Sequence, residues 1–238
     1  MTQNDPRESA GTILLVGASR GLGHAMAAEF IEQDWIVIGT VRGTGRTLLH
    51  DLADAHPGRV EIEQLDITQP DQIAALRQRL SGRRIDILFV NAGTANADQD
   101  ETISEVSTSE FVRVMVTNAL SPMRVIEGLQ DLMSPTGMIG IMSSGQGSVA
   151  NNVKGGHEIY RSSKAALNQH MRSYAARHAG DPRALLLVAP GWIRTDLGGP
   201  NAPFGVEETV PQIVTLLLAQ LGKPGLQYLD REGRTVPW

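Results

Sequence analysis

Tyr160 and Lys164 are the residues of this sequence whose types and spacing most directly suggest chemistry. They lie four positions apart, so on a helix they share one face, about 6 Å apart along its axis. A phenol has a reference pKa of about 10 and exchanges protons poorly at neutral pH unless a neighbouring cation favours the phenolate. Lys164 could supply that cation. A tyrosine and a lysine one turn apart are also ordinary on the surface of an amphipathic helix, so the rest of the chain must decide.

The composition predicts one domain that binds a small molecule. The 238 residues, of which 41% are hydrophobic, can bury one sizeable core, and no linker interrupts them. We expect a single domain over residues 12–238 after a polar, flexible tail over residues 1–11. A net charge of −5 without a basic run argues against nucleic acid or an anionic membrane as the main partner. The chain lacks cysteine and its six histidines have no partner at ligand spacing, so we expect no metal.

A glycine-rich turn lies between the first predicted strand and the first predicted helix. The strand covers Thr12–Val16, the helix covers Ala25–Ile31, and the turn reads Gly17-Ala18-Ser19-Arg20-Gly21-Leu22-Gly23. Glycines let the backbone approach a pyrophosphate closely, and the helix points its N–H groups at the same anion. The spacing G-x-x-x-G-x-G departs from the commoner G-x-G-x-x-G, and tight strand–helix turns need glycines in any case. The place between strand and helix favours a dinucleotide site.

The charge pattern after the second predicted strand indicates which dinucleotide would bind. Dinucleotide-binding folds usually place an acidic residue near the end of this strand, here Trp35–Thr40, against the ribose 2′-hydroxyl. No acidic residue lies between Asp34 and Asp51, whereas Arg42 lies there and Arg20 lies in the glycine turn. Two guanidinium groups suit a 2′-phosphate, which a carboxylate would repel. Either arginine alone could be simply solvated, but together they favour NADP over NAD.

Strands and helices continue to alternate along the chain. Further strands are predicted over Val60–Leu65, Ile85–Val90, Met138–Met142, Ala184–Ala189 and Leu226–Leu229, and further helices over Pro70–Arg79, Thr108–Met133, Tyr160–His178 and Glu207–Leu221. This alternation predicts an α/β, doubly wound Rossmann-type parallel sheet of about seven strands with helices on both faces. Pro122 cannot donate to the carbonyl of Asn118, so we expect a local break in that helix at Asn118–Pro122.

Polar and small residues directly follow several predicted strands. They are Asp66, Asn91-Ala92-Gly93, Ser143-Ser144 and Pro190-Gly191. The carboxyl ends of parallel strands form the edge where ligands bind in such sheets, so we expect these residues to gather there. Asp and Asn are also favoured in turns without any ligand. Taken alone, Asp66 or Asn91 could therefore be a turn residue that binds no ligand.

The chain resembles the short-chain dehydrogenase/reductase family from about residue 12 to its end, because these motifs occur together in that family's order. The resemblance rests on the glycine turn, Asp66, Asn91-Ala92-Gly93, Asn118, Ser144, Tyr160 with Lys164, and Pro190-Gly191 with Thr195. Within the family, the segments Tyr160–Asn168 and Tyr228–Trp238 are similar to those of the C-factor-like and sniffer-like carbonyl reductases. Val16 replaces the threonine often found ahead of the glycine turn, which puts a stabilising hydrogen bond in doubt.

The resemblance implies roles for individual residues. Tyr160 donates a proton, Ser144 hydrogen-bonds the substrate carbonyl, and Lys164 lowers the phenol pKa and holds the nicotinamide ribose. Asn118 is the fourth catalytic residue. Ser143 competes with Ser144, but the family's serine stands three residues before a glycine, and Gly147 selects Ser144. The implied cofactor contacts are Gly17, Ser19, Arg20, Gly21, Leu22, Gly23, Arg42, Asp66, Ile67, Asn91, Ala92, Gly93, Tyr160, Lys164, Pro190, Gly191, Ile193 and Thr195.

The implied function is NADPH-dependent reduction of a ketone or aldehyde to an alcohol. One alternative is an alcohol dehydrogenase that works in the oxidative direction with NADP(H) as cofactor. Another is an NADP(H)-binding signalling or regulatory protein that uses the same fold. Dinucleotide binding requires neither Ser144 nor the Tyr160 hydroxyl, so their presence favours the enzyme. We expect a cytoplasmic protein with a small-molecule carbonyl or alcohol substrate and no nucleic acid or membrane partner, while a homodimer and a homotetramer both stay open.

Three loops are expected to form the walls of the substrate pocket. They cover Thr94–Gln99, Gly145–Glu158 and Trp192–Phe204. Gly198–Gly205 contains three glycines and two prolines, so we expect no helical lid there and a comparatively open, mobile site.

Overall fold

The computed structural model describes residues 10–238. Of the flexible tail expected over residues 1–11, residues 1–9 lie outside this described part. The next two residues pair with the sheet, because the Ala10 N–H donates to the Asp34 carbonyl and the Gly11 carbonyl accepts from the Ile36 N–H. Within the described residues, main-chain pairing with the sheet is therefore present from residue 10.

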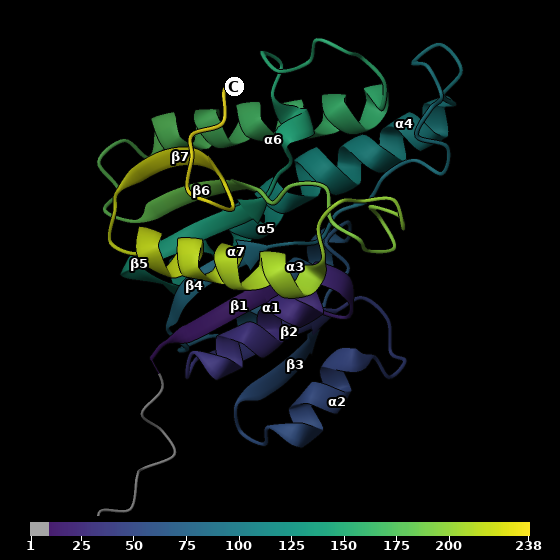
Figure 1. Cartoon of the computed structure of the whole chain (residues 1–238). Coiled ribbons are helices and arrows are strands. Elements are labelled where there is room, and N and C mark those ends of the chain that lie inside the picture. The colour runs from purple at the N-terminus through teal and green to yellow at the C-terminus, as the bar shows by residue number, and fades with distance from the viewer. Residues whose placement is uncertain (1–9) are drawn as a thin grey trace, which may run out of the picture.

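Seven parallel strands form one sheet (Figure 1). They are β1 (Thr12–Val16), β2 (Ile36–Val41), β3 (Val60–Gln64), β4 (Ile85–Val90), β5 (Met133–Met142), β6 (Ala184–Ala189) and β7 (Gly225–Asp230). Their order is β3-β2-β1-β4-β5-β6-β7, and each neighbouring pair is parallel. The predicted doubly wound Rossmann-type fold is confirmed. The strand order switches direction between β1 and β4, and at this place such sheets bind their ligands beyond the carboxyl ends of the strands.

Helices cover both faces of the sheet (Figure 1). One face carries α1 (Gly21–Glu32), α2 (Leu48–Ala55) and α7 (Val206–Gln220), and the other carries α3 (Pro70–Arg79), α4 (Thr108–Met115), α5 (Ser121–Leu129) and α6 (Glu158–Arg177). Alternate residues of each strand point to opposite faces. On β1, Ile13 and Leu15 belong to the core beneath α1 and α7, whereas Leu14 and Val16 belong to the core beneath α3, α5 and α6.

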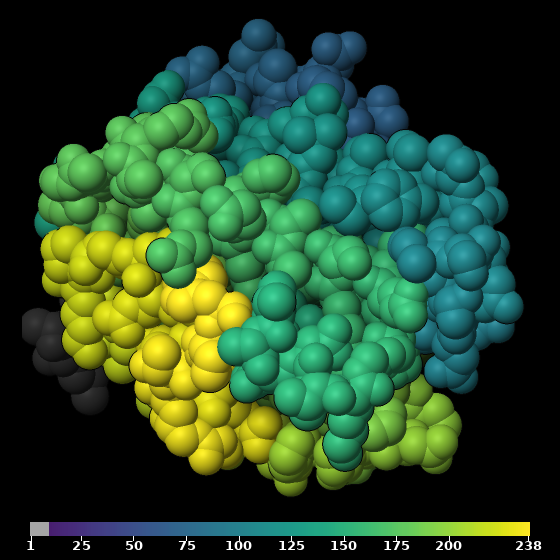
Figure 2. All heavy atoms as spheres, turned by 90° about the horizontal axis from the view of Figure 1, so that it is seen from above, coloured from purple at the N-terminus to yellow at the C-terminus, as the bar shows by residue number. Residues whose placement is uncertain are grey.

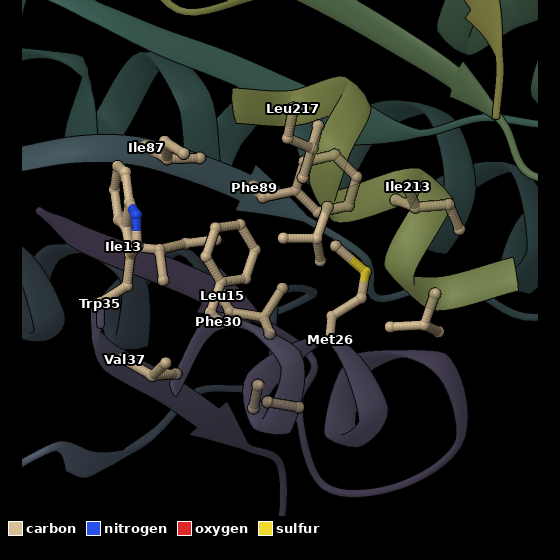
Figure 3. Close-up of a cluster of buried hydrophobic side chains, with 14 of the residues drawn as sticks. Ile13, Leu15, Met26, Phe30, Trp35, Val37, Ile87, Phe89, Ile213 and Leu217 are labelled. Atoms are coloured by element: carbon tan, nitrogen blue, oxygen red, sulfur yellow. The ribbon is translucent and has the colours of Figure 1, made fainter. Parts of the chain in front are cut away.

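The core beneath α1 and α7 fixes the start of α1 and therefore the glycine turn. Figure 3 shows how side chains from both helices meet over the sheet, among them Met26, Phe30, Ile213 and Leu217. Phe30 also packs edge-on against Trp35, with ring centroids 5.6 Å apart. Each fully buried side chain of this kind stabilises the fold by about 1.5–3 kcal/mol. On the opposite face, Leu167, Met171 and Tyr174 anchor α6 in the same way, which fixes Tyr160 and Lys164 on that helix.

The helix expected over Thr108–Met133 is interrupted. α4 and α5 are joined by η1 (Val116–Leu120), a π-helical segment immediately ahead of the turn that contains Pro122. The break expected at Asn118–Pro122 is therefore confirmed, and its cause is the missing N–H of the proline.

Several expected element boundaries were wrong: α1 begins at Gly21 and not at Ala25, and the largest differences lie between α5 and β5. The long helix ends at Leu129 and is followed by the 3₁₀ turn η2 (Gln130–Leu132), so β5 begins at Met133 and not at Met138. An irregular register opposite Ile85–Ile87 lets Met133 pair with Ile85 before regular pairing starts. The helix α2 was not expected, because it is only eight residues long and buries only Leu49, which leaves a weak hydrophobic pattern.

Candidate active site

Close contacts explain two of the three glycines in the turn after β1. A Cβ on Gly23 would lie 2.0 Å from the Gly17 carbonyl oxygen, and one on Gly17 would lie 2.8 Å from the Ala92 nitrogen. Gly17 also has a φ of 90°, which residues with side chains rarely adopt. Gly21 differs, since a Cβ there would meet only Thr195, at 4.0 Å. The turn therefore packs closely against Ala92 after β4 at Gly17, whereas the space beside Gly21 is open.

The first turn of α1 is free to receive an anion. Arg20 precedes the helix in an extended conformation, its side chain does not cap the helix, and the first turn contains no acidic residue. Uncapped N–H groups at a helix N-terminus, together with the helix dipole, favour a phosphate. Within the turn, Ser19 is half-buried and Leu22 packs against the core. The local structure fits the pyrophosphate of a dinucleotide.

Two side chains from neighbouring strands hold the glycine turn. Asn91 Nδ2 donates to the Gly17 carbonyl at 2.8 Å, and Thr40 Oγ1 accepts from the Gly17 N–H at 2.9 Å. Thr40 is 1% exposed near the end of β2. No local sequence pattern indicates its role, because the contact joins two different strands. It supplies a hydrogen bond to the turn that Val16 cannot make. The departure from the family pattern at Val16 therefore leaves the turn supported.

The two arginines expected near the cofactor have different contacts. Arg20 forms an ion pair with Asp196 in the loop after β6, and both side chains are mostly exposed. Arg42 is exposed, and its side chain makes no ion pair with any residue that the structure describes. Exposed ion pairs contribute little, so Arg20 could exchange Asp196 for a phosphate at small cost. Arg42 already has its charge available for a ligand.

Asp66 and Ile67 lie just beyond β3, with contacts that serve the loop itself. Asp66 Oδ1 accepts from the N–H and the hydroxyl of Thr68, at 2.9 Å and 2.7 Å. The Ile67 side chain is buried in the core beneath α3. These contacts give both residues a structural role, and a contact of either residue with a cofactor stays a prediction.

The Asn118 side chain connects the segment after β4 to α6. It is fully buried, its Oδ1 accepts from the Thr94 N–H at 2.8 Å, and its Nδ2 donates to the Thr94 carbonyl at 2.8 Å. Nδ2 also lies 3.0 Å from Oγ of Ser163, which immediately precedes Lys164. A Cβ on Gly93 would lie 3.5 Å from Lys164 Nζ, so the space beside Gly93 faces the ammonium group.

Tyr160 and Lys164 lie one turn apart at the start of α6. Lys164 Nζ is buried, donates to the Met142 carbonyl at 2.9 Å and lies 5.9 Å from the centre of the Tyr160 ring. Burial lowers the pKa of Lys164 to about 8. Burial also raises the pKa of Tyr160 to about 12, against the effect of a hydrogen bond with Ser144. Desolvation dominates the pKa of the phenol in this structure, and the lowering expected from Lys164 stays a prediction. Tyr160 is protonated at neutral pH.

The two serines after β5 have different surroundings. Ser143 is 2% exposed, and its hydroxyl donates to Asn168 Oδ1 at 2.6 Å. Ser144 is half-buried and accepts from the Gln146 N–H at 3.1 Å, and its side chain lies near enough to the Tyr160 phenol to lower that group's pKa against the effect of burial. Ser144 is therefore the serine that faces the phenol, while Ser143 supports the core.

The segment after β6 forms an irregular loop at the same edge of the sheet. Pro190 is buried, and Gly191 has a φ of 98°. Ile193 is buried and pairs with Phe204 across the loop, while the Thr195 hydroxyl accepts from a main-chain N–H within it. Residues 192–205 contain no helix, which confirms the expected absence of a helical lid there. The loop instead exposes apolar side chains, chiefly Trp192 and Leu197.

Residues 10–238 contain no group of three or more histidine, aspartate or glutamate side chains arranged to hold a metal ion. In the same part of the chain, no helix combines the length and the apolar character needed to cross a bilayer.

Comparisons with known proteins agree with this architecture. A family model described as enoyl-(acyl carrier protein) reductase matches residues 17–210. The chain is 31% identical over 189 residues to 1-hydroxy-2-glutathionyl-2-methyl-3-butene dehydrogenase of Rhodococcus sp. strain AD45, which covers 78% of this chain and 79% of that protein. It is 30% identical over 156 residues to C-signal of Myxococcus xanthus, which covers 65% of this chain and 93% of that protein.

Solved structures of similar proteins have the same fold. A Burkholderia multivorans protein described as a short-chain dehydrogenase/reductase, with NADP bound, superposes with a TM-score of 0.95 at 65% identity, covering 96% of this chain and 99% of that one. A carbonyl reductase from Pseudomonas aeruginosa PAO1 in complex with NADP superposes with a TM-score of 0.89 at 33% identity, covering 97% and 100%.

Proposed function

The chain belongs to the short-chain dehydrogenase/reductase family, and on this premise we propose that it is an NADPH-dependent reductase of ketones or aldehydes. The observation that carries the proposal is the meeting of Ser144 with Tyr160, one helical turn from the buried Lys164. All three lie near the edge of the sheet that also bears an uncapped helix N-terminus.

The residues present fit NADP(H). The open space at Gly21 and the first turn of α1 suit the pyrophosphate, and Arg42, with its unpaired charge, suits the 2′-phosphate. Lys164 Nζ lies beside Gly93 after β4, and its ammonium group could donate to the hydroxyls of the nicotinamide ribose. Bound NADP in two similar structures supports the same choice of cofactor. When bound, NADPH supplies the hydride for carbonyl reduction.

The protein's own groups would handle the proton and the developing charge. The Ser144 hydroxyl orients the substrate carbonyl and stabilises negative charge on its oxygen by hydrogen bonding. Tyr160 donates its phenolic proton to that oxygen, and Lys164 holds positive charge nearby. The raised pKa of Tyr160 keeps this proton in place at neutral pH, which suits a donor better than a base.

The test is NADPH oxidation, followed by absorbance, against a panel of ketones, diketones and aldehydes. We expect turnover with at least one carbonyl class and clear preference for NADPH over NADH. An enoyl thioester belongs in the panel, because reduction of a C=C bond is the reaction named by the matching family model. Turnover of that thioester alone would replace the carbonyl assignment. NADPH binding without turnover of any substrate would favour the signalling or regulatory alternative, for which the likeness to C-signal is the supporting observation.

A cytoplasmic location and a homodimeric or homotetrameric state complete the proposal. Oligomerisation is supported by three exposed apolar side chains on α4 and η1, namely Phe111, Val112 and Leu120. Light scattering on the purified protein measures the oligomeric state, and cell fractionation measures the location.

A further inference from the structure

A buried polar network joins the turn at Ser144 to β7 and α6. Tyr228 of β7 is 1% exposed, and its hydroxyl donates to the main-chain carbonyl of Ser144. Ser143 Oγ donates to Asn168 Oδ1, and Asn168 Nδ2 donates to the Gly147 carbonyl at 3.2 Å. Asn168 and Ser143 lie near enough to the Tyr228 hydroxyl to lower its pKa against the effect of burial. Buried networks of this kind are rigid when every member is paired, so Tyr228 holds the main chain at Ser144 while Asn168 holds it at Gly147.

The same turn is pressed against α6 beside Lys164. A Cβ on Gly147 would lie 3.0 Å from the Lys164 carbonyl carbon and 2.9 Å from Asn168 Nδ2, so only glycine allows this approach. Within the turn, the Ser144 carbonyl also accepts from the Gly147 N–H at 2.9 Å. That carbonyl therefore has two donors, one inside its own 3₁₀ turn η3 (Gly145–Gly147) and one from β7. Together they set the orientation of the peptide that carries the Ser144 side chain.

Trp238 extends this support to the loop over residues 148–157. Its ring centroid lies 5.3 Å from that of Tyr228, and the Arg172 guanidinium lies 4.6 Å from the indole. The Trp238 main-chain carbonyl accepts from the Ala150 N–H at 3.0 Å. In Figure 2 the loop (green) stands out from the surface directly beside the yellow segment that contains Trp238. Tyr228 in β7 and Trp238 after β7 therefore support the two ends of the segment from Ser144 to Ala150.

We propose that Tyr228 is a positioning residue for Ser144, and that Trp238 holds Tyr228 and Ala150 in the arrangement that this requires. Tyr228 acts through the main chain of Ser144 and keeps the Ser144 hydroxyl in place beside Tyr160. This proposal rests on the proposed function, because the position of Ser144 matters for turnover only if its hydroxyl orients a substrate carbonyl.

Tyr228→Phe is the decisive variant, with Tyr174→Phe as its matched control. Tyr174 is also fully buried, and its hydroxyl donates to Gln130 Oε1 at 2.6 Å. It lies 14 residues beyond Tyr160 on α6, about 21 Å along the helix axis. Both variants lose one buried tyrosine hydroxyl, so we expect similar small decreases in Tm. Only Tyr228→Phe should lower kcat, by about tenfold or more, because small displacements of a catalytic group reduce rates strongly.

The binding of NADPH separates positioning from general damage. We expect both variants to keep the wild-type dissociation constant for NADPH within about twofold, because the glycine turn and α1 lie elsewhere in the sheet. A second variant, Trp238→Ala, should raise the KM of the carbonyl substrate and leave NADPH binding unchanged. Equal kcat values for Tyr228→Phe and Tyr174→Phe would overturn the positioning role.

Hydrogen–deuterium exchange tests the same proposal without turnover. Amides over residues 144–150 should exchange faster in Tyr228→Phe and in Trp238→Ala than in wild type, and at the wild-type rate in Tyr174→Phe. If the wild-type protein reduces no carbonyl compound, the proposed function fails, but this exchange experiment still decides the structural claim. Unchanged exchange over residues 144–150 in both variants would overturn it, whatever the activity.

Discussion

Lys164→Met should change the stability of the ligand-free protein in a strongly pH-dependent way. Lys164 is 4% exposed, and burial lowers its pKa to about 8 from the ordinary 10.5. Below both values the lysine is protonated in the folded and in the unfolded chain. Between them the unfolded chain holds one more proton than the folded chain, so wild-type stability rises with pH across this window. At about 1.36 kcal/mol per pKa unit, the rise amounts to about 3 kcal/mol.

Methionine has a similar length and no charge, so the variant lacks this pH dependence. The substitution also removes the donor that lies 2.9 Å from the Met142 carbonyl. A buried carbonyl without a partner costs about 1–3 kcal/mol at every pH. Near pH 7 the two effects oppose each other, and we expect the variant to range from equally stable to about 2 kcal/mol more stable than wild type. From there to pH 10.5 its stability relative to wild type should fall by about 3 kcal/mol.

The assay is urea unfolding followed by circular dichroism at a series of pH values, without cofactor. The control is Lys154→Met, because Lys154 is exposed in the loop before α6 and its replacement removes no buried charge. The difference between variant and wild type cancels the titration of all other groups. A Lys164→Met difference that stays constant within about 0.5 kcal/mol from pH 7 to pH 10.5 would refute the reasoning, because it would mean that the ammonium group is not desolvated.

Two further substitutions test the cofactor site. Arg42→Asp should weaken NADPH binding by about tenfold or more, because charge-assisted hydrogen bonds contribute about 1.5–3 kcal/mol. The kinetics of the same variant with NADH are the internal control, and the prediction is wrong if both cofactors are affected equally. Gly23→Ala should abolish NADPH binding and lower Tm, since its Cβ would lie 2.0 Å from the Gly17 carbonyl oxygen. Gly45→Ala, which meets nothing within 4 Å, should do neither, and wild-type binding by Gly23→Ala would show that the turn can relax.

Local patterns in the sequence were enough to predict the sheet and the residues at its carboxyl edge. Most of the strands contain a short apolar run, and the residue that follows a parallel strand must lie at that edge whatever the rest of the fold does. Ser144 was separated from Ser143 only by the family resemblance, in which the serine stands three residues before a glycine, and in the structure Ser144 lies beside Tyr160 whereas Ser143 is hydrogen-bonded to Asn168. The break in the helix at Pro122 could also be predicted locally, because proline lacks the N–H that would bond the carbonyl four residues earlier.

Contacts between distant segments could not be predicted in this way. Thr40 supports the glycine turn from a neighbouring strand, and Tyr228 reaches Ser144 from a strand 84 residues later in the chain. Neither contact can be recognised from the nearby sequence, because each depends on which strands are neighbours in the sheet. The net shift in the pKa of Tyr160 could not be predicted for a similar reason. Spacing showed that Lys164 lies on the same helical face, but burial of the phenol, which dominates, depends on the whole tertiary structure.

The most direct test of the proposed chemistry compares Tyr160→Phe with wild type in two assays on the same preparation. Fluorescence titration measures the dissociation constant for NADPH, and absorbance measures NADPH oxidation with the best carbonyl substrate. We predict a dissociation constant within about twofold of wild type and a kcat lower by at least about 100-fold, because only the proton donor is removed. A Tyr160→Phe variant that binds NADPH normally and keeps more than about a tenth of the wild-type kcat would contradict the assignment of Tyr160 as the proton donor.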